Sequence, residues 1–535
     1  MIKKILDIFF FNTDFEKKLE NTYKILENND QIKEIYKLKE KLQNIRYNYK
    51  VEEIDNIFPK FDFDIYLSLN QFIYSRLVNK SLFTSKLMFA MALNKKFSFP
   101  LPKIYLKEIS KKVKVNYFLS TIFFYLFVII FFFYQFFLIL KSFLFFFKRK
   151  KETKKIIYID SVPNLFSDSS NNDKCLDFFK WTVMKFEIKT NLIFIHSNYK
   201  IKNKKIKIGN NYYETRFLKN PIAYFLNFSN ILYFTTSLIK TIFIFFKIII
   251  FHKTELLLLI KEIYFFYLFK DIKENYNLCL FNNSNMVFRP PWTYINEKKI
   301  EDSVFVYFYS TNQMPLLQEL TNEKYYEAYG YSLHTWKNYV TWSEDQEKWL
   351  NSYTRKENKY FRTAFIPFEG KYTKSIKKKK ILTIFDVPPH KIGIYYLLNN
   401  SYNIYTLEYC KKFVEDIIKA IPENLYREID IIFKIKKREH NNIHPLYKKY
   451  INEITSQKNI KLISDISAGS IIDMSDATIS IPFTSTAITA HRKGKYSIYY
   501  DPSEKLSKNN CLENDVELIT SFKELESWIA NCFKK

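Results

Sequence analysis

The chain has 535 residues, of which 47% are hydrophobic and 19% aromatic, and 83 Lys and Arg against 55 Asp and Glu give it a net charge of +28. This hydrophobic content supports a sizeable core and excludes a globally disordered chain. The length predicts about three units of roughly 150 residues, or two larger units with an appendage. The basic excess favours anionic partners: phosphates, lipid head groups or nucleic acid.

The cysteines are scattered and contain no CxxC pair; they are Cys175, Cys279, Cys410, Cys511 and Cys532. That spacing argues against a disulfide framework or a structural zinc site, and it fits a reducing compartment. The apolar run near the N-terminus is interrupted by charge too soon for a secretory signal.

Helical patterns open the chain. Residues 14–60 have helical spacing and mixed charge, which predicts one or two solvent-exposed helices. Residues 61–115 are expected to form a small helical appendage. We therefore assign residues 1–115 to an N-terminal helical region.

An uncharged apolar stretch covers residues 117–140, inside a hydrophobic membrane segment that we place at 116–150. As a helix the stretch would be about 36 Å long, enough to cross a bilayer core of about 30 Å. Basic residues lie on both sides, at 111–114 and 148–151, so the positive-inside rule does not choose an orientation. Membrane contact is predicted, with a span, a re-entrant or in-plane helix, and a buried helix as open alternatives.

Short apolar runs alternate with helical stretches after residue 150. The runs predicted as buried strands are 154–160, 190–197, 275–282 and 303–310. Strands that alternate with helices indicate a parallel sheet with helices on both faces. We therefore predict a first Rossmann-like domain over residues 151–370.

A second apolar region lies within that domain, at 223–253. Lys240 and Lys247 are seven residues apart and so share one helical face, while the rest is apolar. This pattern predicts an interfacial helix whose lysines reach lipid phosphates, with a long core-packing helix as the alternative.

A basic run at 370–380 is a plausible linker, and a second α/β series follows over residues 381–535. Its predicted strands lie within 381–391, 428–440, 459–467, 476–490 and 494–503, with a helix around 405–420 and another at the C-terminus. Two consecutive Rossmann-like domains joined by a linker favour an α/β fold of the GT-B-like kind, with the helical appendage and the membrane-associated hydrophobic helices added to it.

A hydroxyl-rich turn stands out in the second series. In ISIPFTSTAITAHRK the strand ends at Pro482, and Thr484, Ser485 and Thr486 open a helix. Hydroxyls and backbone N–H groups at a helix N-terminus are suited to a phosphate, and ligands of open α/β sheets bind at the carboxyl ends of strands. The alternative is that a hydroxyl merely caps the helix.

A basic strand end precedes that turn. Lys434, Lys436 and Arg438 share one face of the predicted strand, and cations converging at a strand end suit a diphosphate, with Arg able to bind two oxygens. A solvated basic loop is the alternative.

Carboxylates follow the first strand of each series. Asp160 follows the first strand of the first domain, and Asp386 and His390 follow that of the second. Together with Glu439 they are candidate catalytic groups, because transfer to a hydroxyl needs a base to accept its proton. An Asp in this position is also a common turn former.

No GxxxxGK[ST], GxGxxG, HExxH or GxSxG motif is present, and no DxD pair stands at a strand end. These absences favour a mechanism without a metal, in which cations and a helix dipole neutralise phosphate charge. No metal ligands are therefore predicted.

Three stretches carry a family resemblance: FDVPP (385–389), FKIKKR (433–438), and SIPFTSTA (480–487) with KYSIYYDP (495–502). They resemble the PFTS-motif polysaccharide biosynthesis proteins, and their order is similar to that of the donor domain of GT-B glycosyltransferases. The resemblance covers residues 380–505 well and 155–370 loosely.

The resemblance implies a membrane-associated enzyme of bacterial surface-polysaccharide synthesis, such as capsule or O-antigen. It would move a sugar from a nucleotide-sugar, a co-substrate in place of a cofactor, onto a lipid-linked acceptor. The first domain would bind the acceptor and the second the donor, both on the cytoplasmic side of an anionic membrane. A polyol-phosphate transferase and a non-catalytic membrane scaffold are the alternatives. Nucleic acid is not an expected partner, because only the charge favours it.

Overall fold

The structure is a computed structural model. It describes residues 13–29, 31–45, 47, 57–58, 61, 63–143, 156–160, 181–188, 192–196, 204–208, 211–218, 230–273, 275–282, 287–308, 329–354, 357–363, 379–389, 406–435, 443–457, 460–464, 466–482, 484–506 and 516–533.

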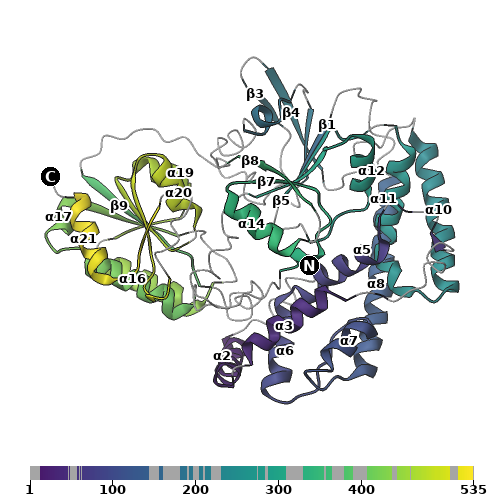
Figure 1. The fold of residues 1–535 in the computed structure, drawn as a ribbon, viewed down its shortest axis with the longest axis horizontal. Coiled ribbons are helices and arrows are strands. Elements are labelled where there is room, and N and C mark those ends of the chain that lie inside the picture. Colours follow the sequence, from purple (N-terminus) through teal and green to yellow (C-terminus); the bar gives the residue numbers. More distant parts are fainter. Residues whose placement is uncertain are drawn as a thin grey trace.

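An eight-stranded sheet forms the centre of the first domain, in the order β3-β4-β2-β1-β5-β6-β7-β8 (Figure 1). All neighbouring strands are parallel except β3 and β4. The strands are β1 (Ile156–Asp160), β2 (Leu192–His196), β3 (Lys204–Ile208), β4 (Asn211–Leu218), β5 (Leu278–Asn282), β6 (Val304–Tyr307), β7 (Asn338–Thr341) and β8 (Lys359–Arg362). The four predicted strands are confirmed as β1, β2, β5 and β6. The others were not predicted.

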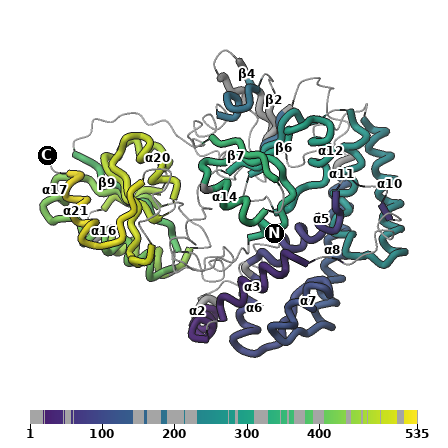
Figure 2. Tube along the Cα trace, viewed as in Figure 1, coloured from purple at the N-terminus to yellow at the C-terminus, as the bar shows by residue number. Residues whose placement is uncertain are grey.

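Some helices of this domain precede the sheet along the chain, and others lie between its strands. They are α2 (Thr13–Asn28), α3 (Ile32–Gln43), α5 (Ile65–Ile73), the π-helix η1 (Tyr74–Val78), α6 (Ser81–Ala92), α7 (Lys103–Ile109), α8 (Tyr117–Phe143), α10 (Ile231–Ile250), η5 (Thr254–Leu259), α11 (Ile260–Asp271), α12 (Trp292–Lys299), η7 (Tyr331–Leu333) and α14 (Glu344–Tyr353). Figure 2 shows the N-terminal helices grouped beside the strands of the first domain.

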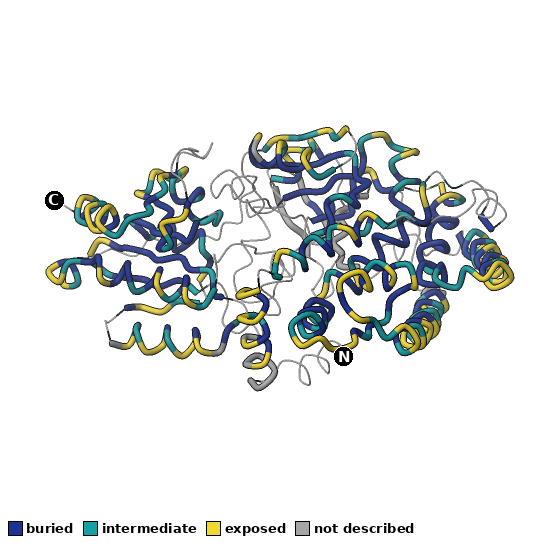
Figure 3. The backbone as a smooth tube through the Cα atoms, turned by 60° about the horizontal axis from the view of Figure 1, so that its bottom comes forward, coloured by how far each residue is buried: buried dark blue, intermediate teal, exposed yellow. Residues whose placement is uncertain are grey.

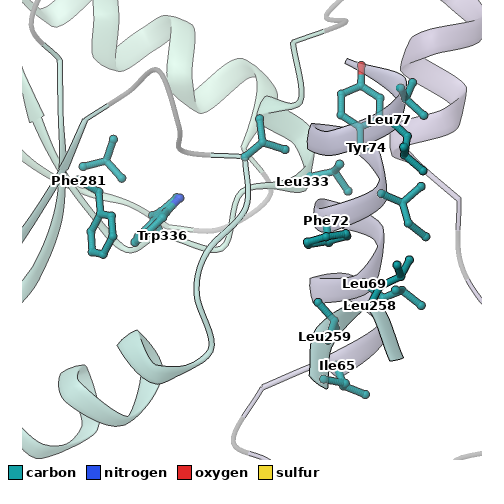
Figure 4. Packing of buried hydrophobic residues seen from close by; sticks show 14 of the residues in the cluster. Ile65, Leu69, Phe72, Tyr74, Leu77, Leu258, Leu259, Phe281, Leu333 and Trp336 are labelled. Carbon is teal, nitrogen blue, oxygen red and sulfur yellow. The ribbon is translucent and has the colours of Figure 1, made fainter. Parts of the chain in front are cut away.

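The expectation that the helices within 14–60 are solvent-exposed is wrong, because α2 and α3 bury apolar side chains. One hydrophobic core runs from Leu19 to Leu350 and includes both the N-terminal helices and the first sheet. In Figure 4 residues of α5 and η1 lie in one cluster with Leu258 and Leu259 of η5 and Leu333 of η7. The apolar residues of α3 recur at helical spacing, so they form a stripe that is stable only against a partner, and the rest of the domain supplies it.

The long apolar helices α8 and α10 are each buried along one side and exposed along the other. Over the described residues, these are the two helices long and apolar enough to cross a membrane by length and composition. Helix α8 is continuous from Tyr117 to Phe143, so a re-entrant hairpin within 117–140 is wrong. The exposed ammonium of Lys240 pairs with Asp271 of α11 at 2.7 Å, and its predicted role at lipid phosphates stays a prediction.

A six-stranded, wholly parallel sheet forms the second domain, in the order β11-β10-β9-β12-β13-β14. Its strands are β9 (Lys380–Phe385), β10 (Ile429–Lys434), β11 (Lys461–Ile463), β12 (Ala477–Ser480), β13 (Tyr496–Tyr500) and β14 (Glu517–Ile519). Its helices are α16 (Leu407–Ala420), α17 (Leu425–Glu428), α18 (Pro445–Gln457), α19 (Ala468–Met474), α20 (Ser485–Arg492) and α21 (Phe522–Phe533). All five predicted strands of this series and both predicted helices are present.

Two helical layers cover this second sheet (Figure 1). Alternate residues of β9 enter different cores: Leu382 and Ile384 join the core that contains α16, α18 and α21, whereas Ile381 and Phe385 join the core that contains α19. This is the period-2 burial of a strand covered on both faces. The two sheets confirm the predicted GT-B-like fold of two Rossmann-like domains.

Candidate functional site

The strand order of the second sheet reverses between β9 and β12. Counted along the chain, its strands stand in the order 3-2-1-4-5-6, with β9 as the first and β12 as the fourth. In sheets of this order, ligands bind outside the carboxyl ends of the strands at the reversal, because the flanking loops diverge there. A ligand-binding site is therefore expected at the loops after β9 and β12.

The predicted residues of this domain meet at that edge. Phe385 at the end of β9 is in register with Lys434 of β10 on one side and with Ser480 of β12 on the other. The Ile481 N–H donates to the Phe385 carbonyl at 3.2 Å. Asp386 and the hydroxyl turn thus leave the sheet side by side.

The hydroxyl turn is a connected cluster. The Thr484 hydroxyl donates to the Ile481 carbonyl at 2.8 Å, and its oxygen lies 3.1 Å from that of Thr486, which lies 3.1 Å from that of Ser480. The Tyr499 hydroxyl donates to the Thr484 carbonyl at 2.9 Å and holds the turn against β13. These contacts fix the start of α20 at the end of β12.

The start of α20 has properties that suit an anion. Thr484 occupies the N-cap position with extended backbone, yet its side chain makes no cap hydrogen bond. The alternative that its hydroxyl caps the helix is therefore wrong, and the first-turn N–H groups have no intrahelical acceptor. The half-buried Ser485 hydroxyl has no hydrogen-bond partner among the described residues. A free hydroxyl, N–H groups and the positive end of a helix dipole thus meet at one point.

Lys434 is buried and already engaged. Its ammonium donates to the carbonyls of Ile435 at 2.6 Å and Ser464 at 3.1 Å, so it joins the ends of β10 and β11. Lys436 and Arg438, predicted to share its face, lie outside the described residues, as do Glu439 and His390. The contribution of these four residues to the site stays a prediction.

Asp386 is buried and held by α18. The Tyr447 hydroxyl donates to a carboxylate oxygen of Asp386 at 3.0 Å. Burial, reinforced by the charge of Asp386, raises the pKa of Tyr447 well above its usual value, so the phenol stays a donor. The His444 N–H donates to the Pro389 carbonyl at 2.9 Å and fixes the other end of the same loop.

A cavity of about 180 Å³ opens between this edge of the sheet and α18. It is largely apolar, with a few polar groups around it, and it is lined by Asp386, Pro388, Ile435, Ile443, Tyr447, Lys448, Ile451, Asn452, Leu462 and Ser464. The hydroxyl turn packs on the α20 side of the sheet, because the Ser497 hydroxyl bonded to β12 also donates to the Ala487 carbonyl. The cavity and the turn therefore flank the loop that leaves β9 from opposite faces.

Asp160 occupies the equivalent place in the first sheet. It is buried at the end of β1, beside β5, where that strand order reverses, and its carbonyl accepts from the Tyr307 hydroxyl at 3.0 Å. Asp160 and Asp386 thus lie at the reversal points of two different sheets. They are two separate candidates and not a pair within one sheet.

Sequence reasoning missed Tyr447 and Ser480. Ser480 had a usable signal: Thr478 and Ser480 alternate with apolar residues along β12, which marks a strand face where polar groups are tolerated. Tyr447 had none, because it is 61 residues from its partner Asp386. The described residues contain no group of three or more His, Cys, Asp or Glu arranged to hold a metal ion.

Comparison with known proteins gives a family match by sequence. The model described as polysaccharide biosynthesis PFTS motif protein matches residues 239–529, more than half of the chain. A search of curated proteins gave no match.

Solved structures show low similarity. An α,α-trehalose 6-phosphate synthase from Burkholderia multivorans is 8% identical, with 72% of this chain and 91% of that chain covered and a TM-score of 0.37. A trehalose-6-phosphate protein from E. coli, bound with UDP-2-fluoro glucose, is 8% identical, with 71% and 91% covered and a TM-score of 0.34. The pneumococcal O-GlcNAc transferase, in complex with UDP and GlcNAc, is 12% identical, with 51% and 52% covered and a TM-score of 0.31.

Proposed function

We propose, from the premise that this chain belongs to the family of polysaccharide biosynthesis PFTS motif proteins, that it is a glycosyltransferase using a nucleotide-sugar donor. One observation carries the proposal: the turn that contains Pro482, Thr484 and Ser485 lies at the strand-order reversal of the second sheet, where open α/β sheets bind their ligands. The second domain would accordingly bind the donor.

The donor would lie across the end of β9. Its phosphates would meet the α20 N-terminus, with the hydroxyls of Thr484, Ser485 and Thr486 donating to them. Its nucleoside would enter the cavity on the other face, where the Asn452 amide and the Asp386 carboxylate offer polar contacts inside an apolar lining. In this arrangement the hydroxyl turn and the loop after β9, which both carry the family resemblance, would each contact the donor.

Charge on the leaving nucleotide has to be neutralised as the sugar departs. The helix dipole of α20 serves that purpose, and Lys436 and Arg438 at the end of β10 would add positive charge. Lys434 would contribute indirectly, since its ammonium holds the strand ends in place.

The acceptor hydroxyl needs a base within hydrogen-bond reach. Asp386 is bound to Tyr447 on the cavity side, which favours a positioning role toward the donor. Asp160, in the proposed acceptor domain, is the stronger candidate for the base, and His390 is the other. Exchange of Asp160 for Asn should abolish transfer while donor binding persists.

The acceptor would be a lipid-linked glycan at the cytoplasmic face of the membrane, in a pathway such as capsule or O-antigen synthesis. The exposed apolar sides of α8 and α10 support contact with the bilayer. The net charge of +28 supports an anionic surface as the partner.

Calorimetric titration of the full chain in mild detergent with UDP-, GDP-, CMP- and CDP-linked donors tests the proposal. One sugar nucleotide should bind, and Ser485→Ala should weaken its binding by about 10- to 150-fold, because one hydrogen bond to a charged acceptor contributes about 1.5–3 kcal/mol. Thr489→Val is the matched control: it removes a hydroxyl one turn further along α20, where that hydroxyl donates to the Ser485 carbonyl.

The donor panel also separates the alternatives. Preference for a CDP-linked polyol would indicate a polyol-phosphate transferase on the same site. Binding of no donor, with the fold intact, would refute the proposal and favour a scaffold.

A further inference from the structure

We infer that α8 and α10 together form a two-helix plate that lies flat in one leaflet of a bilayer, so that the chain enters the membrane without crossing it. The inference rests on the proposed function only in taking the membrane as the place where the acceptor is found. It concerns how the first domain is held there.

The exposed side chains of both helices are mostly apolar, with Thr235 and Lys240 of α10 among the exceptions. The side chains exposed on α8 include Phe118, Ile122, Phe123, Leu126, Ile129, Ile130, Phe133, Phe137 and Leu140, and those on α10 include Leu232, Ile239, Ile242, Phe243, Phe246, Ile249 and Ile250. At the right of Figure 3 both helices are exposed on the side that faces away from the body. The rings of Phe132 and Phe245 stack at 5.0 Å and join the helices into one surface.

The inner side of the plate holds buried polar residues. Gln135 of α8 is buried, and its amide donates to the carbonyls of Leu257 at 3.3 Å and Leu258 at 2.9 Å. Its carbonyl accepts from the Lys261 N–H at 3.3 Å. On α10, Ser237 and Thr241 are also buried. Each helix therefore has a side fixed to protein and a side suited to hydrocarbon.

A crossing is incompatible with the way α8 is attached. It is buried against the domain both near its start, at Ser120, and near its end, at Ile139. Lys261 contacts Gln135 well inside the apolar stretch, and Lys261 forms an ion pair with Glu262 at 2.9 Å. If α8 stood upright in the bilayer, this end of α11 would enter the hydrocarbon with its charges, which is costly. With the plate flat, α11 lies above the lipid.

Charge favours lipid over a second copy of the chain as the occupant. Neither helix contains Asp or Glu, whereas exposed Lys114 and Lys141 stand at the two ends of α8. Two plates packed face to face would bring these lysines together without carboxylates from either helix. Anionic head groups at the same depth would pair with them.

Flotation of the full chain with vesicles of phosphatidylcholine and phosphatidylglycerol tests the surface. The protein should float, and Phe133→Glu with Phe243→Glu should reduce the floating fraction at least tenfold, since both residues are exposed and the fold does not depend on them. Tyr496→Glu is the matched control, an exposed aromatic on the second sheet. Protein that stays in the dense fraction as a stable dimer would overturn the inference.

Thiol labelling tests the orientation. Lys114→Cys and Lys141→Cys are placed singly in a chain whose Cys175, Cys511 and Cys532 are Ser, and inside-out membrane vesicles are treated with an impermeant maleimide. Both positions should react from the outer side of these vesicles. Reaction from opposite sides, or from neither, would overturn the flat plate. Donor binding by calorimetry is independent of both results, so failure here is distinguishable from failure of the proposed enzyme activity.

Discussion

Arg289 is the residue whose exchange most directly tests the buried ion pair in the core of the first domain. It is 2% exposed, and its guanidinium pairs with Glu297 at 2.7 Å, donates to the Thr335 carbonyl at 2.6 Å and lies 3.9 Å from the ring centre of Tyr294. Its backbone N–H donates to Gln71 of α5 at 3.2 Å. The same arginine thus links α5, α12 and the loop before β7.

Arg289→Met removes one partner of this pair and leaves the other. Breaking a buried pair in this way costs about 3–5 kcal/mol, and because the Glu297 side chain keeps 18% of its exposure we expect the lower end, about 3 kcal/mol. Urea unfolding of the first domain, monitored by tryptophan fluorescence, measures this loss in the free energy of unfolding, since Trp292 and Trp336 are buried in that core.

A double variant separates the charge from the packing. Arg289→Met with Glu297→Leu removes both charges, so it should be more stable than the sum of the two single changes implies. A loss below about 1 kcal/mol for Arg289→Met, or strict additivity of the double variant, would refute the reasoning.

Three further predictions concern single side chains. Burial lowers the pKa of His334 from 6.5 to about 3, so the unfolded chain takes up a proton at a higher pH than the folded chain does. The free energy of unfolding of the first domain should therefore fall by about 1.4 kcal/mol per pH unit as the pH falls from 6.5 toward 3. Urea melts at several pH values should show this slope, and His334→Phe should flatten it. Gly330→Ala should lower the free energy of unfolding by about 2 kcal/mol in the same melts, because φ is +113° and the new Cβ would lie 2.8 Å from Val287 Cγ2. Tyr447→Phe should destabilise the second domain by about 1.5–3 kcal/mol in thermal melts, since it leaves the buried Asp386 without its phenol donor, and an unchanged melting temperature would contradict that role.

The second domain was largely predictable because its signals are local. β9 is a short apolar run followed by a carboxylate, and the turn after β12 carries three hydroxyls at the start of a helix. A buried parallel strand needs an unbroken apolar run, so such segments are visible without knowledge of their partners. The carboxyl-edge position of Asp386 and the hydroxyl turn followed from that pattern.

The features that were not predicted depend on contacts between distant parts of the chain, which the local sequence does not encode. β8 was missed because it is only half-buried and has too few apolar residues to form a strand pattern. β7 is buried but was missed because Asn338 and Thr341 leave it without an unbroken apolar run. The stripe of α3 shows that this helix needs a partner, but not that the partners are α2, α6, α7 and η1, nor that these helices share one core with the first sheet. Likewise, the engagement of Lys434 with Ser464 joins residues 30 positions apart, so the lysine was predicted to face a phosphate.

Some of the many lysines lie on the edge strands of the two sheets. Three of the four edge strands contain Lys or Arg: β3 is KKIKI, β8 has Lys359 and Arg362, and β11 has Lys461 paired with Asp430 at 3.0 Å. The fourth, β14, contains Glu517. Charged edges discourage one sheet from adding to another, which is a hazard for a chain so rich in aromatic strands. Part of the excess of +28 therefore protects the protein from aggregating with its own copies, so neutralising edge lysines should lower its solubility before it affects any ligand.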